Sequence, residues 1–434
     1  MHALSLISMP QLEHAEFSII YQQQLDLCRL KVLSRTSNLD MSQKQPSALE
    51  PLSRKVKKGY VRGQEPAPSL LNHYRGHRGS INSVAFHPNL ETVYSAGTDG
   101  FIMSWNFRRE TRALRFEGHE KPVNEVALSK DGDLMLSASD DATVRVWVPI
   151  IKGDFLSLKA HSAAVRSVCF NPVETSQFAT CSNDKTVKLW SVQRFKTKAN
   201  TTKFKSHDFI TSFSNHTNWV RSVRYSRDGR LLCTASDDKS IRVYDLRNNT
   251  CVHTLSCDAG TPTKADFNPC GGYYVGVSTT ANSFLLYDAR MEKLLQSYTN
   301  LNDGPVNSFA FHPGGDFAVT VSEDAKIKIL DLVEGRPIFT LYGPRTGVLA
   351  TAFSPDGKLF ATGGKDRELL IWEPVLLPYS EDEIATDYNK ENSASLQGSK
   401  ASERASVAGT ESRNISQSGS KSSTSSRQTI HSMS

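Results

Sequence analysis

The chain has 434 residues, 38% of them hydrophobic, and a formal net charge of +6. No apolar run approaches the roughly 18 residues of a membrane span, and no basic and apolar leader with a small-residue cleavage site opens the sequence. The seven cysteines include no CxxC pair, which is typical of reduced thiols in a cytoplasmic protein. The sequence therefore argues against a membrane protein, and the small net charge argues against a nucleic-acid partner.

Residues 1–68 are predicted to be an N-terminal extension outside the folded domain. Apolar residues at positions 12, 19, 20, 27 and 30 follow a rough helical stripe, which indicates a short amphipathic helix within residues 11–33. Residues 34–68 are rich in Ser, Lys, Pro and Gln, as expected for a disordered linker. The basic run at residues 54–58 fits a nuclear-import signal, a patch for an acidic partner or, more simply, a solvated linker.

A repeat of nearly constant length fills the middle of the chain. Seven hydrophobic runs end in a bulky residue, and successive ends are 42, 43, 54, 43, 43 and 42 residues apart: Trp105, Trp147, Trp190, Tyr244, Tyr287, Leu330 and Trp372. A period of about 40 to 45 residues is that of a four-stranded propeller blade. The sequence predicts an all-β fold, a seven-bladed β-propeller over residues 69–376, between disordered N-terminal and C-terminal extensions.

One strand has no blade of its own. Residues 70–74 precede the first repeat, whereas the last repeat has sequence for only three strands after Gly347. We therefore expect the first strand to complete the last blade, because this closure removes an open sheet edge.

Polar residues recur at fixed places in the repeat. An Asp stands six positions before the terminal residue of six repeats, a Ser or Thr precedes each Asp by four positions, and a His opens each of the first four repeats: Asp99, Asp141, Asp184, Asp238, Asp324 and Asp366, with His77, His119, His161 and His216. This pattern resembles the WD40 repeat, in which the Asp accepts a hydrogen bond from the His while a hydroxyl and an indole N–H extend the network. We interpret these residues as structural rather than catalytic or metal-binding, because buried polar groups need partners.

Repeats five to seven depart from this pattern. Repeat five has Ala281 in the place of the Asp and Val277 in the place of the hydroxyl, repeats five and six lack the opening His, and repeat seven has Gly343 and Pro344 there. We expect these blades, and blade five above all, to be held more loosely.

The sequence contains no enzyme motif. It lacks a Walker loop, GxGxxG, HExxH and GxSxG, so we predict no catalytic residue, no cofactor and no metal. A propeller without such chemistry is typically an interaction platform. The residue five positions after the opening His should lie near the channel mouth, and with Trp219 it gives a candidate protein-interaction face: Asn82, Asn124, Arg166, Trp219, Arg221 and Asn307.

Two features suggest what this face binds. Arg and Trp are enriched at interface hot spots, and the insertion at residues 194–205 includes Lys196, Lys198 and Lys203. We expect the insertion to make the same sector basic, which favours an acidic protein surface as partner. After the propeller, residues 377–434 are dominated by Ser with almost no aliphatic residues, and we expect this tail to remain unfolded.

The junctions between repeats resemble one family in particular. The similarity extends over the whole propeller and is strongest at residues 145–149, 152–153, 160–161, 165–168, 218–221, 294–298, 329–332 and 334–336. These stretches are similar to the centriolar WD-repeat family known as proteome of centriole protein one. The resemblance implies a structural protein of centrioles and basal bodies that binds centriole-wall proteins or tubulin, supports centriole stability and cilium formation, and resides in the cytoplasm, the cytoskeleton and the centrosome. The sequence departs from that family in its long N-terminal extension, in the basic insertion after Trp190 and in a Ser-rich tail without the short coiled coil usual near the C-terminus.

Two other classes stay open. Residues 244–247 and 287–290 resemble the WDxR boxes, with Tyr for Trp, of substrate receptors in cullin-4 ubiquitin ligases. The basic insertion and linker leave an RNA-associated propeller as a third reading, and self-association is compatible with each of the three.

Overall fold

The computed structural model describes residues 67–108, 112–149, 155–196, 202–270, 273–374 and 376, all within one compact unit that ends at Leu376. The expected helix within residues 11–33, the linker with its basic run and the serine-rich tail lie outside the described residues.

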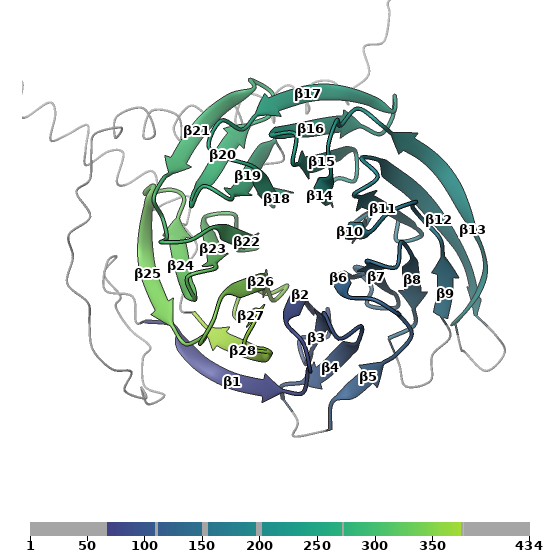
Figure 1. The fold of residues 1–434 in the computed structure, drawn as a ribbon, viewed down its shortest axis with the longest axis horizontal. Coiled ribbons are helices and arrows are strands. Elements are labelled where there is room, and N and C mark those ends of the chain that lie inside the picture. Colours follow the sequence, from purple (N-terminus) through teal and green to yellow (C-terminus); the bar gives the residue numbers. More distant parts are fainter. Residues whose placement is uncertain are drawn as a thin grey trace, which may run out of the picture. The chain divides into compact units, whose positions relative to one another are not determined.

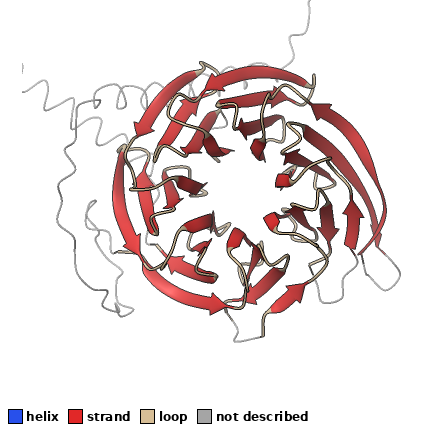
Figure 2. Cartoon of the chain, viewed as in Figure 1, coloured by secondary structure: helices blue, strands red, loops and turns tan. Residues whose placement is uncertain are grey.

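The described residues form seven four-stranded antiparallel sheets around a central axis (Figure 1), which confirms the predicted seven-bladed propeller. Figure 2 shows only strands and loops in this part of the chain. Accordingly, none of its segments is a helix that could cross a membrane.

Each blade has the same order of strands from the channel outward. The innermost strands of blades one to seven are β2 (Ile81–Phe86), β6 (Val123–Leu128), β10 (Val165–Phe170), β14 (Val220–Tyr225), β18 (Pro262–Phe267), β22 (Val306–Phe311) and β26 (Val348–Phe353). The second strands are β3 (Thr92–Gly97), β7 (Met135–Ser139), β11 (Gln177–Ser182), β15 (Leu231–Ser236), β19 (Tyr274–Thr279), β23 (Phe317–Ser322) and β27 (Phe360–Gly364).

The third strands are β4 (Ile102–Asn106), β8 (Val144–Trp147), β12 (Val187–Lys196), β16 (Ser240–Asp245), β20 (Phe284–Asp288), β24 (Lys326–Asp331) and β28 (Glu368–Glu373). The outermost strands of blades one to six are β5 (Leu114–Phe116), β9 (Phe155–Leu158), β13 (Thr202–Phe213), β17 (Thr250–Ser256), β21 (Lys293–Tyr298) and β25 (Arg336–Tyr342).

Blade seven is closed by the first strand of the chain. β1 (Ser69–Arg75) pairs antiparallel with β28, from Ser69 opposite Glu373 to Arg75 opposite Glu368. The expectation that the first strand completes the last blade is therefore confirmed. Both ends of the described chain leave the ring at the same blade.

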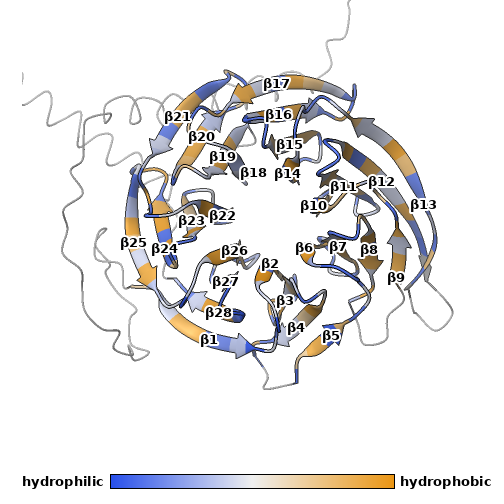
Figure 3. Cartoon of the chain, viewed as in Figure 1, coloured by the Kyte–Doolittle hydropathy of each residue, from blue (hydrophilic) through white to orange (hydrophobic). Residues whose placement is uncertain are grey.

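The core lies between neighbouring blades. One buried cluster joins Leu134 and Val146 of blade two to Phe178 and Trp190 of blade three, and comparable clusters fill the other junctions. Second strands such as β7 and β23 are buried throughout because a sheet packs on each of their faces. Outer strands such as β17 alternate between exposed and partly buried residues, and Figure 3 shows the corresponding bands of hydropathy.

A β-bulge recurs at the start of every innermost strand. In each blade the pairing of the first two strands shifts after the first residue, so that one residue has no partner: Asn82, Asn124, Arg166, Arg221, Thr263, Asn307 and Leu349. A bulge re-aims the side chain that it carries. We call the end of the ring where the innermost strands begin the top face.

Candidate protein-interaction face

The histidines and aspartates of blades one to four form one hydrogen-bonded network per blade. In blade two the His119 ring lies 2.8 Å from Asp141 through Nδ1 and 2.7 Å from the Ser137 Oγ through Nε2. The Trp147 indole N–H donates to the same Oγ at 2.8 Å. This chain, from indole to hydroxyl to imidazole to carboxylate, satisfies every member when a neutral histidine carries its proton on Nδ1.

The bonds from histidine to hydroxyl and carboxylate occur also in blades one, three and four. The carboxylate bonds join His77 to Asp99, His161 to Asp184 and His216 to Asp238. The indole bond occurs in blades one and three, whereas blade four has Tyr244 in the place of the tryptophan. Burial alone would raise the pKa of the Asp238 carboxyl, but hydrogen bonds from Ser240 and His216 outweigh it and lower that pKa to about 2. Burial lowers the pKa of the His216 imidazole below its usual value although Asp238 opposes the shift. The network therefore holds a neutral imidazole beside a carboxylate, with no free position for a substrate.

Blades five to seven have lost the network in different ways. In blade five every polar position is apolar, with Ala259, Val277 and Ala281, and the first two belong to a closed apolar cluster with Tyr287. In blade six Asn302 takes the place of the histidine. Both polar atoms of its side chain are buried and have no hydrogen-bond partner among the described residues.

In blade seven only part of the chain remains. The Trp372 indole N–H donates to the Thr362 Oγ1 at 3.0 Å, whereas Asp366 accepts only from the backbone N–H groups of Arg345 and Glu368 in the described part of the molecule.

The bulged asparagines of the top face bind the next blade. The side-chain amide of Asn82 donates to the carbonyl of Val123 at 3.0 Å, that of Asn124 to Val165 at 2.7 Å and that of Asn307 to Val348 at 2.8 Å. Each acceptor is the first residue of the neighbouring innermost strand. These three asparagines, which the sequence analysis assigned to partner binding, are thus engaged in holding adjacent blades together.

Arg166 is also engaged within the protein. Its guanidinium donates to Asn183 at 2.9 Å and lies 3.3 Å from the Asp140 carboxylate, with 26% of the side chain exposed. Asn124 donates to the same Asp140 at 2.8 Å. Arg166 is therefore the centre of a polar cluster across blades two and three rather than a free cation.

Arg221 and Trp219 form a separate group on blade four. The Arg221 guanidinium makes two hydrogen bonds to Asp237, at 2.8 and 2.6 Å, and lies over the Trp219 ring, 5.3 Å from its centroid. Trp219 is 43% exposed. Within the described residues, no hydrogen bond or ion pair joins this group to Arg166.

The basic insertion lies away from this face, and this corrects the sequence analysis. β12 begins beside the Asp184 turn at the top and runs to Lys196 at the opposite end, where it pairs with the start of β13 as an extended ribbon. The ribbon is anchored there, because Arg194 binds Asp131 at 2.9 Å in the turn after β6. The insertion lengthens a strand that points away from the top, so Lys203 and Lys205 add no charge to the sector of Arg166 and Arg221.

The sequence analysis missed a charged cluster in the channel. Arg224 of blade four forms an ion pair with Glu125 of blade two and lies 3.8 Å from Asp266 of blade five. Burial, with the charge of Arg224 adding to it, lowers the pKa of the Lys264 ammonium to about 8. The sequence does carry a signal for this cluster. The innermost strand is charged at its third position, its fifth position or both in these blades, whereas most other repeats have Ser, Ala or Cys there.

The described residues contain no group of three His, Cys, Asp or Glu side chains arranged to hold a metal. Cys169, Cys181 and Cys233 are buried, as expected of core residues. Burial raises the pKa of the Cys169 thiol to about 12, which makes it unreactive at neutral pH.

Seven repeated sheets, a polar network that supports the blades and a broad top face define a repeat propeller of the kind that acts through its surfaces. The family model "WD domain, G-beta repeat" matches residues 68–106, 110–148, 155–191, 207–245, 292–331 and 335–373, more than half of the chain. The chain belongs to this WD-repeat family. The one blade without a match is blade five, which has lost the polar network entirely.

Nuclear distribution proteins and a receptor-associated protein are among the curated proteins that the chain is similar to. The chain is 24% identical over 346 residues to "Nuclear distribution protein PAC1" of Komagataella phaffii. This match covers 73% of the present chain and 64% of the fungal protein. The chain is 28% identical over 321 residues to the PAC1 of Arthroderma benhamiae, covering 71% and 62%. It is 26% identical over 234 residues to the mouse "Serine-threonine kinase receptor-associated protein", covering 54% and 61%. In each case the match spans less than two thirds of the relative.

Proposed function

We propose that this protein is a non-enzymatic scaffold of centrioles and basal bodies, which binds tubulin or a centriole-wall protein and supports centriole stability and cilium formation. Membership of the WD-repeat family supports the scaffold role. The similarity of the repeat junctions to the centriolar family supports the location. The fungal relatives are named for nuclear distribution. A role in nuclear distribution is an alternative, and the localisation experiment described below tests it as well.

Trp219 is the single observation that favours the top face as the binding surface. It is a large aromatic side chain that is 43% exposed, and the Arg221 guanidinium over its ring is held in place by Asp237. An aromatic anchor that is already positioned loses little conformational entropy on binding. Exposed Trp beside Arg is the composition of an interface hot spot.

The test is the cellular location of a tagged full chain and of its Trp219→Ala variant. We expect the wild type to colocalise with centrioles and to co-purify with tubulin or wall proteins. We expect the variant to lose both while its melting temperature stays unchanged, because an exposed side chain contributes little to folding. Tyr342→Ala is the matched control, since Tyr342 is 52% exposed on β25 at the outer rim, and it should behave as the wild type.

Two outcomes would contradict the proposal. A wild-type protein absent from centrioles would refute the location, and normal location of the Trp219 variant would refute the top face as the binding surface. Charge reversal of Arg166 and Arg221 is a poorer test, because it would place a carboxylate against Asp140 and Asp237 and would disturb folding as well.

The cullin-4 alternative predicts co-purification with a ligase adaptor. Of the two boxes that resemble WDxR, one presents an exposed arginine, Arg247. The other arginine, Arg290, lies 3.0 Å from Asp288 and 5.0 Å from the centre of the Tyr273 ring.

A further inference from the structure

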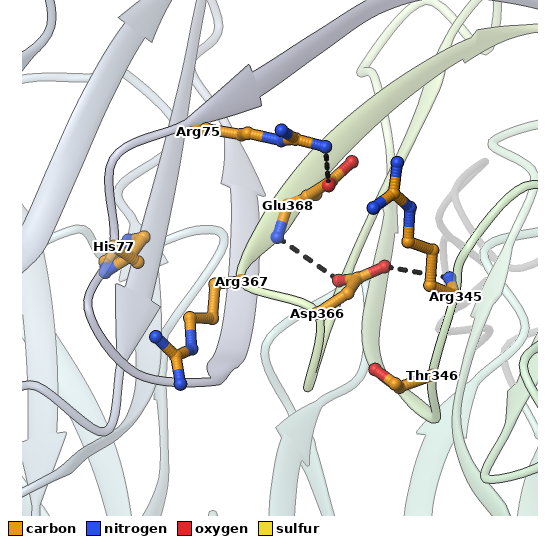
Figure 4. Close-up of a pocket in the computed structure, with 7 residues that line it drawn as sticks. All are labelled: Arg75, His77, Arg345, Thr346, Asp366, Arg367 and Glu368. Atoms are coloured by element: carbon orange, nitrogen blue, oxygen red, sulfur yellow. Dashed lines mark hydrogen bonds and ion pairs between the residues drawn. The ribbon is translucent and has the colours of Figure 1, made fainter.

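A cleft of about 380 Å³ opens at the seam where the ring closes, and Figure 4 shows the residues around it. Arg75 ends β1 and His77 follows it, Arg345 and Thr346 belong to the loop between β25 and β26, and the other three residues lie at the turn into β28. The side chains that matter for its chemistry are Arg75, Arg345, Thr346, Asp366, Arg367 and Glu368.

The cleft borders Asp366, which has no histidine partner in blade seven. In blade four the His216 ring packs against Asp238, 2.8 Å away. In blade seven the corresponding position is Pro344, which has no side-chain donor. The loss of the imidazole leaves Asp366 bordering an open cleft instead of a packed ring.

Two of the three arginines in the cleft are uncommitted. Arg75 is paired with Glu368, whereas Arg345 and Arg367 are exposed and form no ion pair within the described residues. The acidic side chains nearby on blade six are already neutralised, Glu323 by Lys365 and Asp303 by Lys326. The cleft therefore carries a net positive charge, with three arginines against the carboxylates of Asp366 and Glu368.

Arg367 lies at a turn position that every blade shares. The residue at this position has a left-handed backbone in all seven blades, with φ +79° at Gly100 and +65° at Arg367. A left-handed conformation is strained for a residue with a side chain and suits glycine. Glycine would therefore relieve strain at Arg367, whose side chain lines the cleft.

We propose that this cleft binds a phosphate monoester carried by a protein segment, with Arg345 and Arg367 as its main ligands and the Thr346 hydroxyl as a further donor. A guanidinium offers two parallel N–H groups to phosphate oxygens, and a phosphoserine carries close to two negative charges at neutral pH. A nucleic-acid backbone fits poorly, because the neighbouring rim presents closed ion pairs rather than a continuing basic track. The serine-rich residues 377–434 are one source of such a segment, and another protein is a second.

The test uses the full chain and fluorescence anisotropy of labelled peptides. The probe is a peptide of residues 416–427 phosphorylated on Ser422, compared with its unphosphorylated form, with a scrambled phosphopeptide and with inorganic phosphate as competitor. We expect the phosphorylated peptide to bind at least about tenfold more tightly than the unphosphorylated one, which corresponds to the gain of one charge-assisted hydrogen bond. Phosphate should compete.

Variants separate binding from folding. Arg367→Gly should weaken binding of the phosphopeptide about tenfold while the melting temperature stays the same or rises, because glycine relieves the left-handed strain. Lys185→Gly is the matched control: Lys185 has the same turn position in blade three, with φ +71°, where the histidine is present. It should leave binding unchanged.

Equal binding of phosphorylated and unphosphorylated peptides would overturn the proposal, as would equal loss of binding in the two glycine variants. Binding of the tail peptide but not of the scrambled one would identify the chain's own tail as the source, and binding of both would indicate a phosphate site open to other proteins. Neither result depends on whether the protein resides at centrioles.

Discussion

Blades five and six have both lost the histidine network, but the packing that replaces it differs between the two blades. Blade five replaced the histidine, the hydroxyl and the aspartate by apolar residues, of which Ala259 and Val277 pack in one cluster with Tyr287. The Tyr287 hydroxyl is satisfied by the Ser256 carbonyl at 3.2 Å. Blade six kept Thr320 and Asp324 but has Asn302 for the histidine and Leu330 for the tryptophan, and both polar atoms of Asn302 are buried without a partner. Replacing a whole polar network can be nearly neutral, whereas removing part of it leaves the desolvation penalty of the remaining groups.

This comparison changes one expectation. The sequence alone predicts blade five to be the most loosely held. The packing instead identifies blade six as the blade with an unpaired polar side chain, Asn302, in the place of the histidine.

The largest effect is expected from breaking an intact network. Asp238→Ala would remove the acceptor of His216, of the Ser240 hydroxyl and of the Thr217 backbone N–H. The loss of free energy of unfolding should be on the order of 1 to 3 kcal/mol, measured by urea denaturation. Ala281→Ser at the matching place of blade five should stay within about 0.5 kcal/mol of the wild type, and a comparable loss there would contradict the distinction between the blades.

A gain of stability should follow from completing the network of blade six. Asn302→His offers Nδ1 to Asp324 and Nε2 to Thr320, as in blades one to four, and removes the orphaned amide. We expect a stabilisation of about 1 kcal/mol, seen as a higher midpoint in the same denaturation experiment. A destabilised variant would show that Asn302 already has a satisfactory partner.

Acid should affect blades three and four before blade five. Burial lowers the pKa of the His161 and His216 imidazoles below 6.5 in the folded protein, against the effect of their aspartates. The unfolded chain then binds more protons below that pH, so this stability is complete above about pH 6.5 and declines as the pH falls through the folded pKa values. Hydrogen exchange, corrected for its intrinsic pH dependence, should show the decline in blades three and four. Equal loss in blade five, where these positions are apolar, would refute the assignment.

The smallest expected effect is a difference in local opening at neutral pH. Amide protons of β22 and β23 should exchange somewhat faster than those of β18 and β19, because only blade six buries an unpaired amide. Mass spectrometry of the exchanged peptides can resolve the two blades. Slower exchange in blade six would mean that its apolar contacts outweigh the defect.

The fold could be predicted from the sequence because the same pattern of residues recurs in seven repeats. The spacing of Trp105, Trp147 and Trp190 predicts the length of each blade. The extra strand before the first repeat predicts how the ring closes. The top face was less predictable. Whether Arg166 or Arg221 is free depends on residues from other strands, such as Asp140 and Asn183, which only the bulged geometry brings within reach. Likewise, the direction of the basic insertion follows from which end of β12 was lengthened, and composition does not reveal that.

The antiparallel closure of blade seven has a mechanical consequence. Ser69 and Glu373 face each other at one end of the β1–β28 ladder, so a pull between the two flanks of the chain would act on that end alone. Ladder hydrogen bonds run perpendicular to the strands, and such a pull would open them one rung at a time, as in unzipping, instead of shearing all of them together. A propeller tethered to a moving or growing structure through both flanks would therefore yield at this seam under low force, while the other six blades remained folded.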